Sequence, residues 1–127
     1  MVTPVRTLLI VDDEPEIVRL IVKIFEARGF RVLSGRDGQE ALDRVAEHHP
    51  DLLILDIDMP LLDGWEVCRR LRADEATRKM PIVMLTAAHV SPKDAQRGLS
   101  TGADEYVAKP FLREVLVHNV ERLLGIS

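Results

Sequence analysis

Three aliphatic runs of four residues each most constrain how this chain can fold. They lie at residues 8–11 (LLIV), 52–55 (LLIL) and 82–85 (IVML). Each run is too short for a helix and apolar on both faces, as strands covered on both sides of a parallel sheet would be. Two weaker runs, at 30–33 and 105–108, predict strands nearer the edges of the same sheet.

Stretches with a helical period separate these runs. Ile17, Val18, Ile21, Ile24 and Phe25 form one apolar stripe on a predicted helix. The remaining helices are predicted around residues 41–46, 67–71, 91–102 and 111–124. Strict alternation of strand and helix implies right-handed crossovers between parallel strands. The predicted fold class is therefore α/β, with helices on both faces of a five-stranded parallel sheet.

Length and charge limit the classes of function. A chain of 127 residues with no repeat or linker-like tract predicts one domain spanning residues 1–127. No stretch approaches the ~18 apolar residues of a membrane span, and a net charge of −4 disfavours nonspecific binding to nucleic acid or anionic lipid. The single cysteine, Cys68, cannot form an internal disulfide, so we expect a cytoplasmic protein. From the apolar runs and the net charge, we expect neither a membrane nor nucleic acid as a direct ligand.

The residues that follow the strands are the candidates for function. In parallel α/β folds the functional groups gather beyond the carboxyl ends of the strands. Asp12 and Asp13 follow the first run, Asp56 the third, Thr86 the fourth and Lys109 the fifth. Each has a purely structural interpretation as well, since paired acids also occur in turns and caps. Together they predict one shared cleft that combines carboxylates with the ammonium group of a lysine and the hydroxyl of a threonine.

Four segments around these residues resemble a known family. They are "LLIVDDEP", "DLLILDIDMPLLDGWEVC", "PIVMLTA" and "GADEYVAKPF", and they resemble, in order and separation, the receiver domain of bacterial response regulators of the chemotaxis-regulator type. The resemblance covers nearly the whole chain. It implies a doubly wound, flavodoxin-like (βα)5 fold with strand order 2-1-3-4-5.

The resemblance also implies a phosphoryl-accepting metal site. Asp56 matches the phosphoacceptor, while Asp12, Asp13 and the backbone carbonyl of Asp58 match the groups that hold a divalent cation with it. Two like charges about 4 Å apart repel by about 4 kcal/mol at an effective dielectric of 20, so clustered carboxylates require a cation. Mg²⁺ suits these hard oxygen ligands, and Mn²⁺ is a substitute.

A second group of residues matches the family's switch. Lys109 resembles the lysine that pairs with the acceptor and then with the phosphoryl group, and Pro110 its cis-proline neighbour. Thr86 resembles the hydroxyl that bonds the modified aspartate, Tyr106 the aromatic ring that moves with it, and Ala87 the small residue beside them. By the same resemblance, phosphorylation repacks the face formed by the predicted fourth helix, the strand at 105–108 and the last helix.

The partners implied are those of a two-component system. They are a sensor histidine kinase or histidine phosphotransfer protein as donor, and a downstream effector or fused output domain as target. We expect self-phosphorylation and autodephosphorylation as the only chemistry, in a monomer or a phosphorylation-dependent weak dimer. The segment "KPFLREVLVHNV" is one residue shorter than in receivers joined to winged-helix DNA-binding domains, which puts the dimer face of that subfamily in doubt.

Other interpretations of single features stay open at this stage. "DIDMP" resembles the D-x-D loop of haloacid-dehalogenase-type phosphatases, in which Asp56 and Asp58 would be nucleophile and general acid. A flavodoxin-like cofactor binder is a third reading, although acids stand where a glycine-rich phosphate loop would be needed. Glu14 reads as a solvated or capping residue and Trp65 as a partly exposed packing residue.

Overall fold

The computed structural model describes residues 4–87 and 102–126 of the chain. In chain order its elements are β1 (Thr7–Val11), α1 (Pro15–Glu26), β2 (Arg31–Gly35), α2 (Gly38–His48), β3 (Leu52–Asp56), α3 (Gly64–Ala73), β4 (Ile82–Thr86), β5 (Glu105–Ala108) and α5 (Arg113–Leu123). The helix predicted at 91–102 lies outside the described residues, apart from Gly102 at its end.

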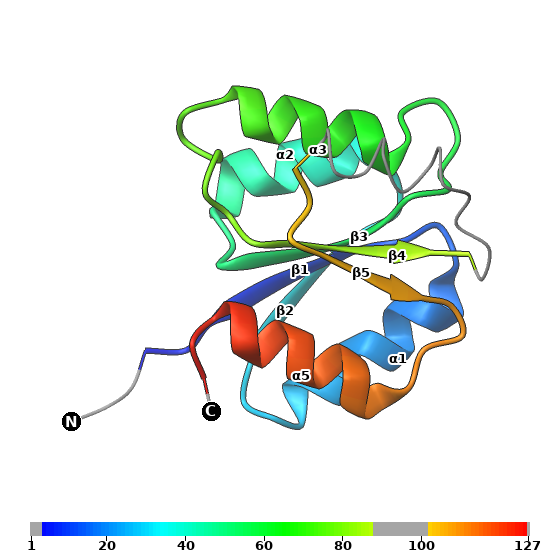
Figure 1. Cartoon of the computed structure of the whole chain (residues 1–127), viewed down its shortest axis with the longest axis vertical. Coiled ribbons are helices and arrows are strands. Elements are labelled where there is room, and N and C mark those ends of the chain that lie inside the picture. The colour runs from blue at the N-terminus through cyan, green and yellow to red at the C-terminus, as the bar shows by residue number, and fades with distance from the viewer. Residues whose placement is uncertain (1–3, 88–101, 127) are drawn as a thin grey trace.

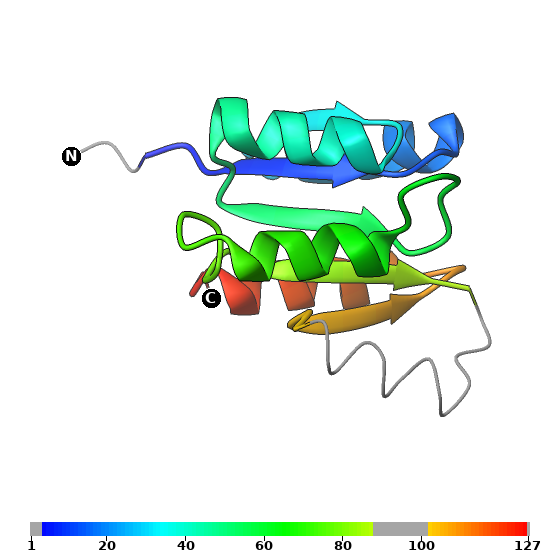
Figure 2. The ribbon, with the colours of Figure 1, turned by 90° about the horizontal axis from the view of Figure 1, so that it is seen from above.

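The five strands form one parallel sheet in the order β2-β1-β3-β4-β5. Helices α2 and α3 cover one face of this sheet, and α1 and α5 cover the other (Figure 1). All strands run the same way, so their carboxyl ends meet at one edge (Figure 2). The fold class and strand order predicted from the sequence are confirmed.

The sheet separates two hydrophobic clusters. Alternate residues of each strand enter opposite clusters: Leu8 and Ile10 pack on the α1 and α5 side, whereas Leu9 and Val11 pack on the α2 and α3 side. All four are fully buried, and burial of each such side chain contributes roughly 1.5–3 kcal/mol. The central strands therefore need apolar residues at every position, which explains the unbroken runs in the sequence.

Helix α3 begins against the end of β3. The Gly64 amide donates to the Ile57 carbonyl at 2.9 Å, and a Cβ at position 64 would lie 2.5 Å from the Asp56 carbonyl oxygen. Only glycine permits this approach. Asp63 caps the helix by accepting a hydrogen bond from the Glu66 amide at 2.9 Å.

No helix in the described part of the chain is both long and apolar enough to cross a bilayer.

Candidate functional site

Three carboxylates meet at the carboxyl edge of the sheet. Asp12 and Asp13 follow β1, and Asp56 ends the neighbouring strand β3. One oxygen from each of the three lies within 4.8 Å of the others. Asp12 and Asp56 are 1% and 3% exposed, whereas Asp13 is open to solvent. The arrangement joins two buried acids to one that faces the outside.

The loops after the strands aim these side chains by hydrogen bonds to the backbone. The Asp12 carboxylate accepts from the Glu14 amide at 2.9 Å, directly before Pro15 opens α1. The Asp56 carboxylate accepts from the Asp58 amide at 3.3 Å. Both loops fold back on the acid that ends the strand, and each buried carboxylate therefore has a defined orientation.

Lys109, which directly follows β5, places its ammonium group at the cluster. Its Nζ lies 2.8 Å from Asp12 Oδ2, 3.4 Å from Asp56 Oδ1 and 3.8 Å from Glu14 Oε2. The Lys109 amide donates to the Thr86 carbonyl at 2.7 Å, and the Lys109–Pro110 peptide bond is cis. One ammonium therefore faces several carboxylates, and the metal-free cluster keeps a negative charge.

The charges shift the proton equilibria of the site. Burial, with the negative charge of Asp12, raises the pKa of Asp56 from 3.8 to about 7, although the charge of Lys109 and the Asp58 hydrogen bond oppose the rise. Burial lowers the pKa of Lys109, but the hydrogen bond to Asp12 and the charges of Asp56, Asp12 and Glu14 outweigh it, so the net pKa is raised. Lys109 is thus held charged while Asp56 is poised to gain or lose a proton.

A cleft of about 460 Å³ opens over this cluster. It is lined by Asp13, Glu14, Ile17, Asp56, Asp58, Ala87, Lys109 and Pro110. The lining combines oxygen ligands, one ammonium and the small side chain of Ala87. It can hold a hard divalent cation beside a small anionic group, because acids and a base face the same space.

Two of the predicted switch residues lie apart from the cleft lining. Thr86 is buried at the end of β4, and its hydroxyl donates to the Ala87 carbonyl at 3.2 Å. The Tyr106 ring packs on the α2 and α3 side, with its centroid 6.1 Å from that of Trp65. Trp65 is only 6% exposed, so the expectation of a partly exposed tryptophan was wrong. Its ring is enclosed because α3 starts so close to β3.

Sequence reasoning missed two contributors to the site. Glu14 is exposed and stands at the N-cap position of α1, in agreement with its interpretation as a solvated or capping residue, but it also lines the cleft within 4 Å of Lys109. Gly64 sets how closely α3 approaches Asp56. The signal available for Gly64 was the Asp-Gly pair that follows the third run, but its contact with the end of β3 is tertiary and leaves no periodic pattern.

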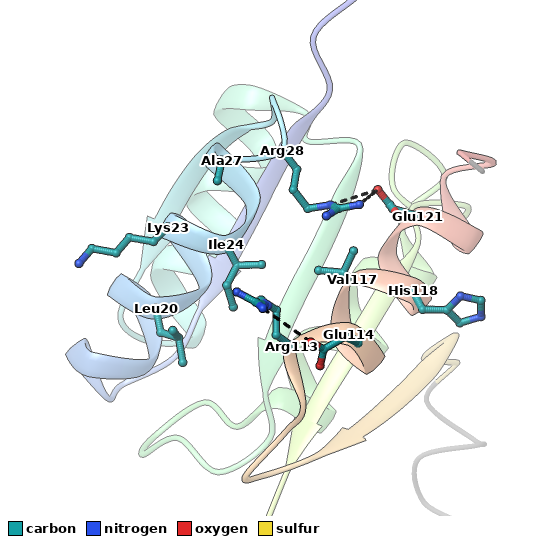
Figure 3. Close-up of a pocket in the computed structure, with 10 residues that line it drawn as sticks. All are labelled: Leu20, Lys23, Ile24, Ala27, Arg28, Arg113, Glu114, Val117, His118 and Glu121. Atoms are coloured by element: carbon teal, nitrogen blue, oxygen red, sulfur yellow. Dashed lines mark hydrogen bonds and ion pairs between the residues drawn. The ribbon is translucent and has the colours of Figure 1, made fainter.

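Larger hollows lie elsewhere on the molecule. One, of about 650 Å³, is a groove between α1 and α5 (Figure 3). Leu20, Ile24 and Val117 are among its apolar residues, and an ion pair of 3.0 Å joins Arg28 to Glu121 across it. Among the described residues, the carboxylate cluster that could hold a metal lies in the smaller cleft, so chemistry rather than size identifies the candidate site.

Comparison with known proteins gives one consistent family. The model of the response regulator receiver domain matches residues 8–121. The DNA-binding response regulator MtrA of Mycolicibacterium smegmatis is 41% identical over 119 residues, covering 94% of this chain and 50% of that protein. The chain thus spans about half the length of the curated relatives it matches.

Solved structures agree with this match. A putative response regulator from Chloroflexus aurantiacus superposes with a TM-score of 0.90 at 35% identity, covering 96% of this chain and 99% of that one. The receiver domain of the sensor histidine kinase PA1611 from Pseudomonas aeruginosa gives a TM-score of 0.86 at 32% identity, covering 96% and 99%. That structure has a magnesium ion coordinated in its active site cleft.

Proposed function

This chain belongs to the response regulator receiver domain family, and from that premise we propose that Asp56 is the phosphoacceptor of a two-component signalling domain that spans residues 1–127. The observation that carries the proposal is the buried Asp56 carboxylate, set against Asp12, Asp13 and Lys109 at an open cleft. A phosphohydrolase of the haloacid-dehalogenase type is not favoured, because the family match and the similar structures are response regulators.

The proposed transfer is a nucleophilic displacement on phosphorus. An oxygen of the Asp56 carboxylate forms a bond to phosphorus while the P–N bond of a phosphohistidine donor breaks. The donor ring, protonated on its other nitrogen, keeps the electron pair of that bond and leaves as neutral imidazole. The product is an acyl phosphate. Hydrolysis of its P–O bond then returns the carboxylate and releases inorganic phosphate, which is the autodephosphorylation we propose.

The residues present fit a divalent cation. Asp12, Asp13, Asp56 and the backbone carbonyl of Asp58 would hold it, since three carboxylate oxygens already lie within 4.8 Å and Asp58 lines the cleft. The chemistry that Mg²⁺ supplies there is neutralisation of charge on the transferring phosphoryl group, and Mn²⁺ would substitute. The pKa of Asp56 is raised first by burial and second by the negative charge of Asp12, and both effects favour a ligand that brings positive charge to this carboxylate.

Lys109, Thr86, Ala87 and Tyr106 would convert the modification into a signal. Lys109 exchanges its carboxylate partners for the phosphoryl oxygens, and the small side chain of Ala87 leaves space for them in the cleft. The Thr86 hydroxyl turns from the Ala87 carbonyl toward the new anion, and the Tyr106 ring follows into the vacated volume. The change shifts a two-state equilibrium at the face that includes β5 and α5.

The partners follow from this chemistry. In the cytoplasm, where we expect this chain to act, a sensor histidine kinase or histidine phosphotransfer protein supplies the phosphoryl group, and an effector protein or fused output domain binds the switched face. The domain acts as a regulatory phosphoacceptor that is charged once per signal, in a monomer or a weak phosphorylation-dependent dimer.

The test is labelling by a small donor. Incubation with acetyl phosphate and Mg²⁺ should add one mass increment of about 80 Da, the mass of a phosphoryl group, by intact-mass spectrometry. Asp56→Asn should abolish the increment, while Asp43→Asn, a matched change at an exposed carboxylate on α2, should keep it. Labelling of the Asp56→Asn protein at the wild-type level would assign the acceptor elsewhere. Turnover of many equivalents of phosphate ester would instead support the function of a haloacid-dehalogenase-type phosphohydrolase.

A further inference from the structure

Arg72, in the last turn of α3, gathers several segments on one guanidinium group. Its Nε donates to the Gly102 carbonyl at 2.8 Å, and its Nη2 lies 2.9 Å from Asp104 Oδ2. Its Nη1 faces the carbonyls of Met80 at 2.6 Å, Arg78 at 3.0 Å and Thr77 at 3.4 Å. The side chain is only 18% exposed. A planar, permanently charged group with five donors suits such a cluster, and lysine could not make these bonds together.

Asp104 carries this connection into the sheet. Its Oδ2, the same oxygen that pairs with Arg72, accepts from the Ile82 amide at 2.8 Å, and its own amide donates to the Ile82 carbonyl at 2.9 Å. Ile82 is the first residue of β4, and Asp104 directly precedes β5. The pair therefore fixes the starts of two neighbouring strands to the end of α3. Figure 1 shows the segment before β5 rising to this helix.

Gly102 makes the arrangement possible. Its φ of +86° is one that residues with a side chain rarely adopt, and a Cβ there would lie 3.1 Å from Arg72 Cγ. The stem of the arginine thus passes directly over the backbone at this glycine. The close packing requires both residues, because neither a bulkier residue 102 nor a shorter residue 72 would preserve it.

The elements tied by Arg72 also meet at the acidic cluster, at the opposite end of the sheet. Helix α3 starts against Asp56, and β5 lies between Asp104 and Lys109, whose ammonium pairs with Asp12 and Asp56. Strand β5 has four residues and, within the described part of the chain, it is an edge strand that pairs only with β4. Such a short edge has few ladder bonds of its own, so its position depends on what holds its ends.

We propose that Arg72 is a positioning residue that, through Gly102 and Asp104, holds β5 in register and thereby places Lys109 at the acidic cluster. Its importance for signalling rests on the proposed function of Asp56. Arg72 acts on Lys109 indirectly, since it contacts Asp104 directly before β5, whereas Lys109 directly follows β5. The role is therefore distinct from the chemistry of the cleft, and it can be measured without phosphorylation.

Amide hydrogen exchange in the unphosphorylated full chain tests the placement of β5. Arg72→Gln should speed exchange of the Lys109 amide, which bonds the Thr86 carbonyl, by about two- to thirtyfold relative to wild type, the range that mutations between coupled sites produce. Amides of β1 should change no more than global stability does. Arg70→Gln is the matched control, because Arg70 lies on the same helix and pairs with the exposed side of Glu66. Faster exchange limited to Ile82, or equal in β1 and β5, would overturn the proposal.

Labelling kinetics then ask whether the placement matters for transfer. With acetyl phosphate and Mg²⁺, we expect Arg72→Gln to change the rate of labelling or decay by at least about twofold. Arg72→Lys should change the rate less than Arg72→Gln does, because it keeps a positive charge beside Asp104. Arg70→Gln should match wild type. Asp104→Asn provides a second route if Arg72→Gln does not fold, and it should also speed exchange at Lys109. Absence of labelling in wild type would reject the role of Asp56 and leave the exchange result to decide the role of Arg72.

Discussion

At the scale of single residues, Asp56 gives the clearest pH dependence. In the folded protein its pKa is raised to about 7 from an ordinary value of 3.8, so between these values the folded state binds more protons than the unfolded state. Stability from this group therefore falls as pH rises from about 4 through 7. The ionised carboxylate is a cost to the metal-free fold at pH 8 and is neutralised at pH 4.

We accordingly expect Asp56→Asn to stabilise the metal-free protein at pH 8 and to have little effect at pH 4. One pKa unit corresponds to about 1.4 kcal/mol, and after allowance for solvent screening at the open cleft we expect a gain of about 1–2 kcal/mol. The groups facing Asp56, namely Asp12, Asp13, Glu14 and Lys109, are present in both proteins. Urea unfolding at both pH values measures the difference, and a pH-independent gain would contradict the assignment.

At the scale of elements, the contact between α3 and β3 depends on Gly64. A Cβ there would meet the Asp56 carbonyl oxygen at 2.5 Å and Ile57 Cα at 2.8 Å, and neither backbone atom can move aside cheaply. Gly64→Ala should therefore destabilise the protein by about 2–3 kcal/mol and slow labelling at Asp56, because α3 must shift away from the strand end. Thermal unfolding and labelling rates measure the two effects.

Gly35→Ala is the matched control for this substitution. A Cβ at Gly35 would lie 3.3 Å from the Glu40 Cβ and 3.5 Å from Val11 Cγ2, so the neighbours would need to shift by only a few tenths of an ångström, much less than at Gly64. We expect it to cost less than about 1 kcal/mol and to leave the labelling rate unchanged. Equal losses in the two variants would show that the approach of α3 to β3 is not the cause.

Among the elements, some could be predicted from the sequence and others could not. Strands β1, β3 and β4 are apolar on both faces because helices cover both sides of the sheet, and their unbroken apolar runs predict this burial. The start of α3 was harder to predict from the sequence. The helix begins at Gly64, three residues before Val67, and neither Gly64 nor the N-cap residue Asp63 is part of an apolar periodicity. Trp65 was misjudged for the same reason, since its burial depends on how closely α3 meets β3.

The candidate site divides in a similar way. Topology alone brings Asp12, Asp56 and Lys109 to one edge, because each ends or directly follows a parallel strand, and the distances among them agree with that expectation. The contribution of Glu14 depends on how the loop after β1 turns back through the Asp12 hydrogen bond. The role proposed for Arg72 depends on segments 30 residues and more apart in the chain, which no local pattern records.

At the scale of the whole molecule, metal binding and folding are linked. A cation that binds the folded cluster and not the unfolded chain adds RT ln(1 + [L]/Kd) to stability, which is about 2.7 kcal/mol at a hundredfold excess over Kd. The gain should be seen in the entire unfolding transition, because Asp12 follows β1 and Asp56 ends β3, which are neighbouring interior strands of the sheet. Added Mg²⁺ should therefore raise the midpoint of thermal unfolding of the wild-type chain.

Asp13→Asn separates this specific linkage from a general salt effect. Asp13 is exposed, so its loss should leave the metal-free stability within about 0.5 kcal/mol of wild type while removing most of the magnesium-dependent gain. Asp43→Asn, at an exposed carboxylate away from the cleft, should retain the full gain. Calorimetric unfolding with and without Mg²⁺ at constant ionic strength compares the three proteins. Because the ionic strength is held constant, an equal shift in all of them would mean that magnesium associates elsewhere on a chain of net charge −4, and not through the carboxylates that follow β1 and end β3.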